Sequence, residues 1–427
     1  MDGLNLITDY IKNGENNHKR LGLELEHFII NSENESVPFD VLSNLVKEIG
    51  MSLCAKLVYI DGYVMGYTLE EYAVSMEPAC QLEISISPYD DLKKIRKIYD
   101  GFYNIWKVAL EKKDYRIITK GLDPRVEKGL IKPSDLKMIP KKRYEYMDKY
   151  FLTSGRYGQH MMRASASTQV SLDYNSEEDL KRKLRVLEKL SPFLMLLMEN
   201  KSDEKSYLGD ESRTHLLRNQ VWNDLDSDRC GFLPGSLDPD YSYEEYGRTL
   251  MSKPLVVYTE NGVTTYAGEK NIIEMGGLKK ETVDHLISMF FYNIRIKKYL
   301  EVRVCDSVPI EDAIGYAALL KGLMYNEECL SELESLLDSI KSIEDINKVL
   351  SEIELHGDEA ALFNNYSAGA ICEEIVRIAA QGLTKGDSDY VRVFCSKFKQ
   401  KDKTKFMAGS IFSKEQRAPK WLGACHI

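Results

Sequence analysis

Two stretches near the N-terminus alternate between apolar and polar side chains. In Leu21–Ile30, Glu24 and Glu26 alternate with Leu23 and Leu25. Successive side chains of a β-strand point to opposite faces of the sheet, so this spacing predicts a strand with both carboxylates on one face. Glutamates are ordinary on an exposed strand, but a face built from carboxylates is equally a site for a hard cation. The segment alone leaves both interpretations open.

The next alternating stretch begins just after Glu77 and Pro78. From Gln81 to Ser87 the polar and apolar residues alternate strictly, with Gln81, Glu83, Ser85 and Ser87 on one face and Leu82, Ile84 and Ile86 on the other. Such alternation predicts that one face lies in the core and the other faces solvent or a cavity. Glu77 precedes a proline, which biases its backbone towards extended conformations.

Two later stretches repeat this layout. The segment 161–174 predicts a third polar-faced strand that contains Gln169, and Tyr299–Asp306 predicts a fourth. In the fourth, Glu301 and Arg303 project from the same face. A carboxylate beside a guanidinium on a rigid strand can hold a metal ion and a phosphate together. A cross-strand salt bridge is the simpler interpretation, but the repetition of polar faces in three other segments favours a site.

The remaining pattern predicts helices around this sheet. Apolar residues recur at helical spacing after Ser87, after Ser176 and from Glu311 to about Leu383. Hairpins are expected at Asp61-Gly62 and Asn261-Gly262. We therefore expect one domain over residues 1–395, helical from about residue 311. The segment 396–427 is expected to form a basic tail.

Composition narrows the class of protein. The 427 residues are 43% hydrophobic, and the formal net charge is −10. This charge argues against nucleic acid as a partner, because phosphate backbones need a basic footprint. No apolar run reaches the length of a membrane span, and the polar first 20 residues lack the apolar core of a secretory signal. The eight scattered cysteines form no C-x-x-C pair, so we expect reduced thiols and a cytoplasmic protein. The sequence contains no P-loop, G-x-G-x-x-G or H-E-x-x-H motif.

Several stretches, taken together and in order, resemble the motifs of plant-type glutamate–cysteine ligases. They span residues from about 20 to about 330 and comprise Gly22 to Glu26, Glu77 to Ser85, Met161 to Asp173, Arg218 to Trp222 with Asp228 to Gly231, Tyr299 to Asp306, and Gly322 to Glu327. Any one of these motifs is weak, whereas several in the same order are strong.

The resemblance implies an α+β fold, the glutamine-synthetase-like catalytic funnel. In this fold a curved antiparallel sheet is lined by carboxylates and helices pack outside it. It also implies an enzyme that uses ATP and Mg²⁺ and small-molecule amino-acid substrates, with no membrane partner. The acid first receives the γ-phosphoryl group of ATP, and the amine of the second substrate then displaces phosphate. The expected product is γ-glutamylcysteine.

By the same resemblance, roles fall on individual residues. The residues expected to bind Mg²⁺ are Glu24, Glu26, Glu77, Glu83 and Glu301. Arg303, with Glu301, is expected to be catalytic by contacting the transferring phosphate, and Gln169 to contact the nucleotide together with Arg303. The residues expected to bind the amino-acid substrates are Arg218, Arg163, Gln81 and Trp222. An ion pair with a loop aspartate is the structural alternative for Arg218.

One departure from the family bears on the acyl donor. The family arginine that is expected to help hold the α-carboxylate of glutamate falls on Ala164. Arg163 is adjacent but would face the opposite side of a regular strand, unless a β-bulge shifts it. Two alternatives therefore accompany glutamate–cysteine ligase: a ligase of the same fold that uses a different acid or amino acid, and a non-catalytic binding homologue. The presence of all five carboxylates and Arg303 weighs against the second alternative, because burying such charges without a cation is costly.

Overall fold

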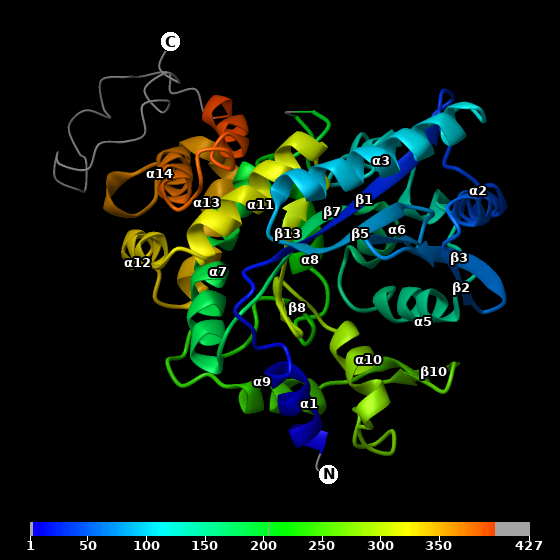
Figure 1. Cartoon of the computed structure of the whole chain (residues 1–427), viewed down its shortest axis with the longest axis horizontal. Coiled ribbons are helices and arrows are strands. Elements are labelled where there is room, and N and C mark those ends of the chain that lie inside the picture. Colours follow the sequence, from blue (N-terminus) through cyan, green and yellow to red (C-terminus); the bar gives the residue numbers. More distant parts are fainter. Residues whose placement is uncertain (1–2, 204, 398–427) are drawn as a thin grey trace.

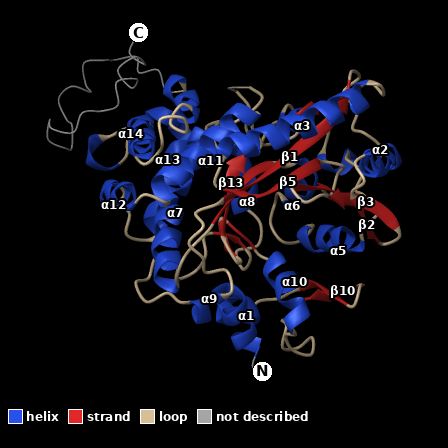
Figure 2. Cartoon of the chain, in the orientation of Figure 1, coloured by secondary structure: helices blue, strands red, loops and turns tan. Residues whose placement is uncertain are grey.

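The computed structural model describes residues 3–203 and 205–397 of the chain. In this part a sheet of nine strands forms the centre, in the order β12-β13-β7-β1-β5-β4-β3-β2, with β6 also beside β1 (Figure 2). All its neighbouring strands are antiparallel. The strands are β1 (Leu21–Asn31), β2 (Lys56–Ile60), β3 (Tyr63–Thr68), β4 (Tyr72–Met76), β5 (Leu82–Tyr89), β6 (Tyr115–Ile118), β7 (Ser167–Leu172), β12 (Ile294–Ile296) and β13 (Leu300–Asp306).

Helices pack on the apolar side of this sheet. Leu23 and Leu25 of β1 are fully buried. The next residue on their face is His27, whose Nε2 shares a 2.9 Å hydrogen bond with Tyr99 Oη of helix α3 (Leu92–Glu111). Helix α11 (Ile310–Met324) contacts α3 and β1, and α7 (Glu177–Leu197) contacts β13 (Figure 1). The opposite face of the sheet therefore remains for the polar side chains.

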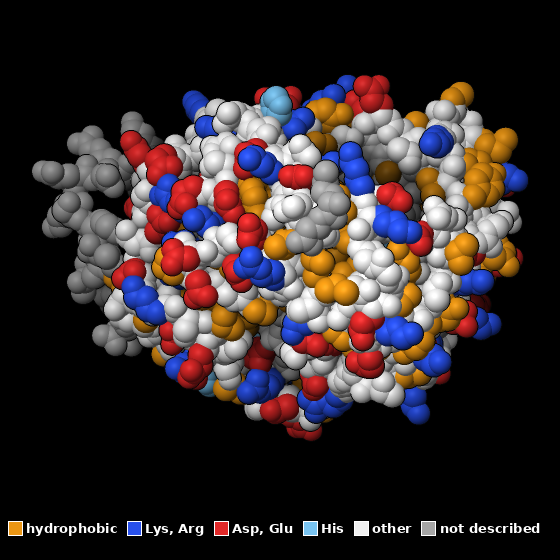
Figure 3. Space-filling view, turned by 90° about the horizontal axis from the view of Figure 1, so that it is seen from below, with side chains coloured by type: hydrophobic (Ala, Val, Ile, Leu, Met, Phe, Trp, Pro, Cys, Tyr) orange, Lys and Arg blue, Asp and Glu red, His pale blue; other side chains and the backbone are white. Residues whose placement is uncertain are grey.

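The remaining elements lie around the sheet and in the lower part of the molecule in Figure 1. They comprise α1 (Gly3–Lys12), α2 (Phe39–Ser52), α4 (Pro124–Glu127), α5 (Lys142–Phe151), α6 (Gly158–Ala164), α8 (Leu217–Asn223), α9 (Tyr243–Ser252), α10 (Val283–Ser288), β8 (Cys230–Gly231), β9 (Val256–Glu260), β10 (Val263–Gly268) and β11 (Phe291–Tyr292). On the face shown in Figure 3, acidic and basic side chains are interspersed over the surface. The buried sheet face described below differs, because carboxylates from several strands gather on it, with arginines at one end.

The predicted α+β class is confirmed, as are both hairpins, β2–β3 and β9–β10. The C-terminal part is helical, with α12 (Glu327–Leu336), α13 (Ile343–His356) and α14 (Ala368–Gln381) after α11. The single-domain assignment stays a prediction, and the expected basic tail lies outside the described residues from 398 onward.

The third predicted strand is wrong in its first part. Residues 158–164 form helix α6, and the strand begins only at Ser167, where strict alternation also begins. Met161 and Met162 are buried in α6, and Ala164, its last residue, is fully buried. The alternative in which a β-bulge re-aims Arg163 therefore has no strand to act on.

Candidate active site on the polar face of the sheet

Strand pairing gathers four predicted residues on the polar face. Glu26 of β1 lies opposite Glu83 of β5, and Glu24 lies opposite Gln169 of β7. Directly opposed residues in an antiparallel sheet have Cβ atoms about 5 Å apart. The alternation that predicted these faces thus also brings the carboxylates from separate strands together.

Glu26 is held in place by β7. The Ser167 backbone N–H donates to Glu26 Oε2 at 2.7 Å, and Gln169 Nε2 donates to Glu26 Oε1 at 3.0 Å. Burial, and after it the nearby charge of Glu77, raises the pKa of Glu26 to about 7, although arginines oppose the increase. This carboxylate is therefore ordered by hydrogen bonds but lies in an environment that disfavours its charge.

Glu77 reaches the same face from a tight turn between β4 and β5. The Cys80 N–H donates to the Glu77 carbonyl at 3.1 Å, and Cys80 has φ of 64°, in the left-handed region that favours glycine. Tyr144 Oη donates to Glu77 Oε2 at 3.2 Å. A non-glycine residue keeps such a strained conformation only where the surrounding structure enforces it, and here the turn that it forms places Glu77.

Crowding of carboxylates is strongest at Glu83. Ser75 Oγ and Ser85 Oγ donate to Glu83 Oε1 at 2.9 and 3.1 Å. Burial raises its pKa well above the usual range, and the charges of Glu77, Glu24 and Glu26 add to the increase. The pKa of Glu24 is likewise raised, by burial first and by Glu301 second. Mutual repulsion of this kind is relieved when a cation enters.

Glu301 differs from the other four glutamates because cations surround it. Arg295 Nε donates to Glu301 at 2.5 Å, Arg303 at 3.0 Å and Lys297 Nζ at 3.4 Å. Burial alone would raise its pKa, but these three cations hold it below the usual range. Arg303 also donates to Gln169 Oε1, so one guanidinium joins β13 to β7.

A narrow cavity borders Arg303. It is lined by Arg218 and Trp222 of α8, by Asn293 and by Arg303 itself. The buried donors Arg218 Nε, Trp222 Nε1 and Asn293 Nδ2 have no hydrogen-bond partner among the described residues. Buried donors are normally satisfied, so these three donors lack a partner that a ligand or water oxygen would supply, and the cavity of about 10 Å³ has room for about one such atom. Of the three donor residues, Asn293 was not predicted.

The start of α8 explains how Arg218 is placed. The preceding Leu216 has φ of 53°, and its N–H donates to Glu199 Oε1 at 2.7 Å. Arg218 NH1 donates to the carbonyl oxygen of Arg303 at 3.3 Å. Arg218 forms no ion pair with a loop aspartate among the described residues, so the structural alternative for this arginine lacks support.

Two of the predicted substrate-binding residues contact other groups. Arg163 forms an ion pair with Asp148 at 2.6 Å and donates to the Leu136 carbonyl at 3.1 Å. Gln81 Oε1 accepts from the Ala79 N–H at 2.8 Å, and its Nε2 donates to the Arg163 carbonyl at 3.2 Å. Both side chains thus fix local backbone, and the structure does not bring them to the Arg218 cavity.

The glutamates do not form a ready metal cage. Within residues 3–203 and 205–397, no group of three or more His, Cys, Asp or Glu side chains is arranged so that it could hold a metal ion. The donor set consists of carboxylate oxygens, the ligand type that Mg²⁺ prefers, and Mg²⁺ usually keeps several waters. The chemistry of these residues therefore fits Mg²⁺ bound through a few carboxylates, water and substrate phosphate.

The model of the glutamate–cysteine ligase family 2 matches residues 20–349. The chain belongs to this family. Similar family members include the chloroplastic glutamate–cysteine ligase of Medicago truncatula, which is 26% identical over 397 residues, covering 89% of this chain and 75% of the relative. Glutamate–cysteine ligase B of Oryza sativa is 24% identical over 378 residues, covering 86% of this chain and 74% of the relative.

Among solved structures, the chain is similar to glutamate–cysteine ligase from Francisella tularensis in complex with AMP. The identity is 16%, the TM-score is 0.48, and the match covers 89% of this chain and 82% of that chain. This distant likeness carries no further argument, and the family assignment depends on the sequence match.

The comparison corrects the predicted cytoplasmic location. The similar family members from Medicago truncatula, Oryza sativa and Nicotiana tabacum are all named chloroplastic, which contradicts the predicted cytoplasmic location. The prediction depended on the scattered cysteines, interpreted as reduced thiols, and on the lack of an apolar secretory signal. Neither feature excludes plastid import, because transit peptides are amphipathic and not apolar. In the described part of the chain, no helix is long and apolar enough to cross a membrane.

Proposed function

We propose that the protein is an ATP- and Mg²⁺-dependent ligase that joins glutamate and cysteine into γ-glutamylcysteine through an acyl phosphate. Family membership supports this assignment. The observation that supports it most directly is the buried face where Glu24, Glu26, Glu77 and Glu83 crowd together beside Arg303. Burying this much negative charge is costly unless a cation shares the site.

Glu24, Glu26, Glu77, Glu83 and Glu301 are the residues that would hold Mg²⁺. When bound, Mg²⁺ neutralises developing charge on the phosphate oxygens. The seryl hydroxyls and the Gln169 amide keep Glu83 and Glu26 oriented with defined oxygens exposed to the site. Glu301 lies between Arg295 and Arg303, so this carboxylate also positions the cations that face the phosphates.

Arg303 is the proposed contact for the transferring phosphoryl group. Its planar guanidinium matches the geometry of phosphate oxygens, and its anchor on Glu301 and Gln169 fixes it before substrate binds. Phosphoryl transfer depends chiefly on such positioning and charge stabilisation. The γ-phosphoryl group leaves ADP and forms a bond to the glutamate carboxylate.

Arg218 and Trp222 are proposed to hold the other carboxylate of the acyl donor. Arg218 Nε and Trp222 Nε1 are unpartnered donors in the cavity beside Arg303. Asn293 Nδ2 adds a third donor at the same place. This amide supplies a contact that Ala164, which is buried in an apolar cluster with Val126 and Leu136, does not supply.

The test is an assay of ADP release with purified protein, ATP, Mg²⁺, glutamate and cysteine, with product identified by mass. We expect ADP and γ-glutamylcysteine in equal amounts, and no ADP above background when glutamate is omitted. Replacing glutamate with aspartate or with longer dicarboxylic amino acids tests the donor. ADP release without any amide product, or none with glutamate and cysteine, would contradict the proposal.

A further inference from the structure

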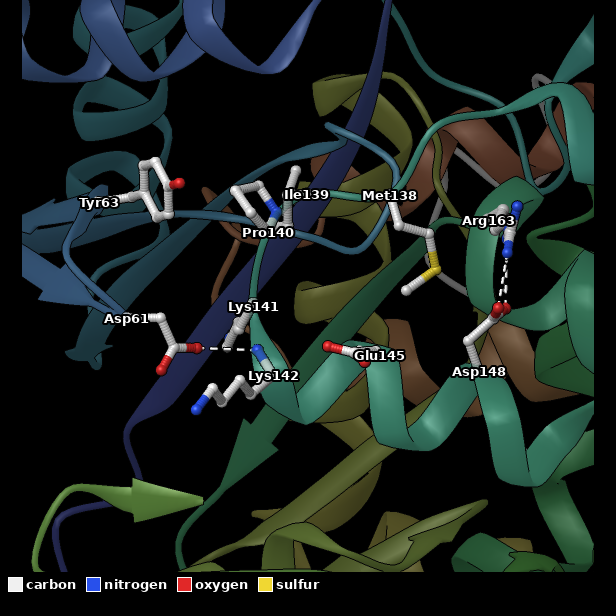
Figure 4. Close-up of a pocket in the computed structure, with 10 residues that line it drawn as sticks. All are labelled: Asp61, Tyr63, Met138, Ile139, Pro140, Lys141, Lys142, Glu145, Asp148 and Arg163. Atoms are coloured by element: carbon white, nitrogen blue, oxygen red, sulfur yellow. Dashed lines mark hydrogen bonds and ion pairs between the residues drawn. The ribbon is translucent and has the colours of Figure 1, made fainter. Parts of the chain in front are cut away.

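The cavity of about 480 Å³ drawn in Figure 4 adjoins the polar face of the sheet. It lies between the β2–β3 turn and helices α5 and α6. Lys141 in its wall places Nζ 4.1 Å from the centre of the Tyr144 ring, and Tyr144 Oη donates to Glu77. This cavity therefore belongs with the site described above.

A second cavity, of about 170 Å³, lies at the junction where β7 ends, β1 begins and helices α7, α11 and α12 come together. This junction cavity is lined from residues 16–19, 173–183 and 324–330, and it includes none of the residues assigned to the site. Met324 and Leu330 form its apolar part. Its volume equals that of about six water molecules, so it suits a ligand the size of a small amino acid and excludes a nucleotide.

Two lysines in the wall of the junction cavity retain N–H groups for a ligand. Lys183 is buried, and its Nζ donates to Asp179 Oδ2 at 2.9 Å and to the Asp173 carbonyl at 3.1 Å. Lys19 Nζ donates to the Tyr325 carbonyl at 3.3 Å. An ammonium has three N–H donors, so these bonds leave one on Lys183 and two on Lys19. Burial lowers the pKa of Lys183, Asp179 opposes the decrease, and the like charge of Lys19 adds to it, which a bound carboxylate would offset.

The backbone of Lys19 is held in a conformation that a lysine rarely adopts. Its φ is 56°, in the left-handed region. Asn16 fixes this segment, because its Nδ2 donates to Asp173 Oδ1 at 3.2 Å and its Oδ1 accepts from the His18 N–H at 2.9 Å. Non-glycine residues keep this conformation only where the surrounding structure enforces it, and such residues cluster at ligand clamps and switch segments.

Two carboxylates in the same wall supply the complementary charge. Asp179 accepts from Lys183 through Oδ2, and Glu327 accepts from Arg182 through Oε1 at 2.5 Å. Among the described residues, the hydrogen bonds to these two acids use one oxygen of each, which leaves the other for an ammonium group. A wall with both signs of charge favours a zwitterion over a simple anion or cation.

The junction cavity also touches the strands that carry the polar face. Tyr325, in its wall, donates from Oη to the Arg20 carbonyl at 2.5 Å and accepts from the Asp173 N–H at 2.7 Å. Arg20 directly precedes β1, the strand of Glu26, and Asp173 directly follows β7, the strand of Gln169. One hydroxyl thus joins the ends of both strands, and a ligand that contacts Tyr325 stabilises this junction.

We propose that the junction cavity is an effector site for a small zwitterionic amino acid. Its carboxylate binds Lys19 and Lys183. Its ammonium binds the remaining oxygens of Asp179 and Glu327. The occupied cavity holds the ends of β1 and β7 together and thereby increases the affinity of the polar face for ATP with Mg²⁺. This increase rests on the proposed function, because it acts on the ATP site of that function, whereas binding of the amino acid does not.

Isothermal titration calorimetry with the full chain tests the site. The ligands are alanine, which has both charged groups, propionate, which has only the carboxylate, and ethylamine, which has only the ammonium. Each is titrated into the wild type, Lys19→Met, Tyr325→Phe and the control Lys12→Met, with and without ATP and Mg²⁺. Lys12 is an exposed lysine at the end of α1 and lies outside the cavity.

We expect the wild type and Lys12→Met to bind one alanine per chain, and to bind propionate and ethylamine at least about tenfold more weakly. Lys19→Met should bind alanine about ten- to hundredfold more weakly, the effect of losing one charge-assisted contact. The melting temperature of this variant should match that of the wild type, since Lys19 is exposed.

The coupling to the polar face is measured in the same titrations. ATP with Mg²⁺ should raise the alanine affinity of the wild type at least about fivefold, and alanine should raise the ATP affinity by the same factor. Tyr325→Phe should bind alanine within about threefold of the wild type but lose this mutual increase, because it lacks the hydroxyl that joins the two strands.

Four results would overturn the assignment. Equal alanine affinity in Lys19→Met and the wild type, or no alanine binding by the wild type, removes the site. Equal affinity for alanine and for either of its fragments makes the cavity a site for a simple ion. An alanine affinity that ATP leaves unchanged removes the effector role. If the wild type binds no ATP, the proposed function fails on its own, and alanine binding that depends on Lys19 still decides the amino-acid site.

Discussion

The sheet face and helix α7 both bury carboxyl groups, and they do so differently. On the sheet face, glutamates from several strands lie near one another and near Arg303 and Arg295. In α7, Glu188 is fully buried, accepts a hydrogen bond from the Leu233 N–H at 3.2 Å, and has an Oε2 with no partner among the described residues. Burial raises the pKa of Glu188 to about 8.

The difference separates a structural acid from a chemical one. A lone buried carboxyl group without a nearby cation avoids the cost of its charge by keeping its proton. Several carboxyl groups that crowd together on rigid strands, with arginines at one end, form a charged surface that suits a cation and phosphate. Burial alone therefore does not indicate function, whereas burial combined with crowding and neighbouring cations does.

The largest expected effect follows removal of charge at the cationic end of the sheet face. Glu301→Gln keeps the shape of the side chain but leaves Arg295, Lys297 and Arg303 without their shared anion. We expect turnover, measured as ADP release, to fall by about a thousandfold, the upper range for loss of one preorganised charge. Thermal stability should also fall, because breaking a buried ion pair typically costs about 3–5 kcal/mol. Circular dichroism identifies the folded fraction, and turnover of that fraction within tenfold of wild type would contradict the prediction.

A smaller loss is expected when the guanidinium is replaced but its charge is kept. The ammonium of Arg303→Lys can pair with Glu301 but cannot present a planar fork to phosphate. We predict about a hundredfold lower turnover and a smaller decrease in melting temperature than for Glu301→Gln. If Arg303 were only structural, melting temperature would fall while turnover stayed near the wild-type value.

The cavity beside Arg303 should show a weaker effect that is confined to the acyl donor. Asn293→Ala removes one of three donors, so we expect the glutamate KM to rise about tenfold with little change in the KM for ATP. Arg163→Ala is the matched comparison, because Arg163 is bound to Asp148 and should leave the glutamate KM within about twofold. The reverse ranking of these two variants would mean that Arg163 reaches the donor.

The smallest effect on catalysis should come from the lone acid. The pKa of Glu188 is about 8 in the folded state, whereas its usual value is 4.5. Between these two pH values the unfolded chain loses this proton and the folded state keeps it. The free energy of unfolding therefore decreases as pH rises through this window. Glu188→Gln cannot ionise, so its stability advantage over the wild type should grow by up to about 1.4 kcal/mol per pH unit across the window and then level off. Urea denaturation at pH values below, inside and above the window measures this difference. A constant difference, or a large loss of ADP release, would place Glu188 with the chemical acids.

The alternation of side chains predicted the polar face because it is a local property of each strand. Glu24, Glu26, Glu83 and Glu301 could each be assigned to the polar face of its own strand from the two-residue period, and the structure confirms those strands. The error at residues 161–166 has the same origin. Those residues do not alternate strictly, so the period supports a strand only from Ser167 onward. The preceding part of the predicted strand is helix α6.

The partners of the site residues could not be predicted in the same way. Arg295 meets Glu301 because β12 pairs with β13 in one register, and pairing across a turn is not encoded in the period of either strand. The run Arg295-Ile296-Lys297 does alternate, so it offered a signal for a short polar-faced strand. Asn293 and Lys141 lie outside any such pattern, and tertiary packing alone brings them to their cavities.

The affinity for Mn²⁺, used in place of Mg²⁺, tests most directly whether the crowded acids form a cation site and the lone acid does not. Electron paramagnetic resonance of free Mn²⁺ gives its affinity for the wild type, Glu83→Gln and Glu188→Gln in the presence of ATP and glutamate. We predict that the wild type and Glu188→Gln bind Mn²⁺ equally, and that Glu83→Gln binds at least about tenfold more weakly. Equal binding by all three proteins would contradict the claim.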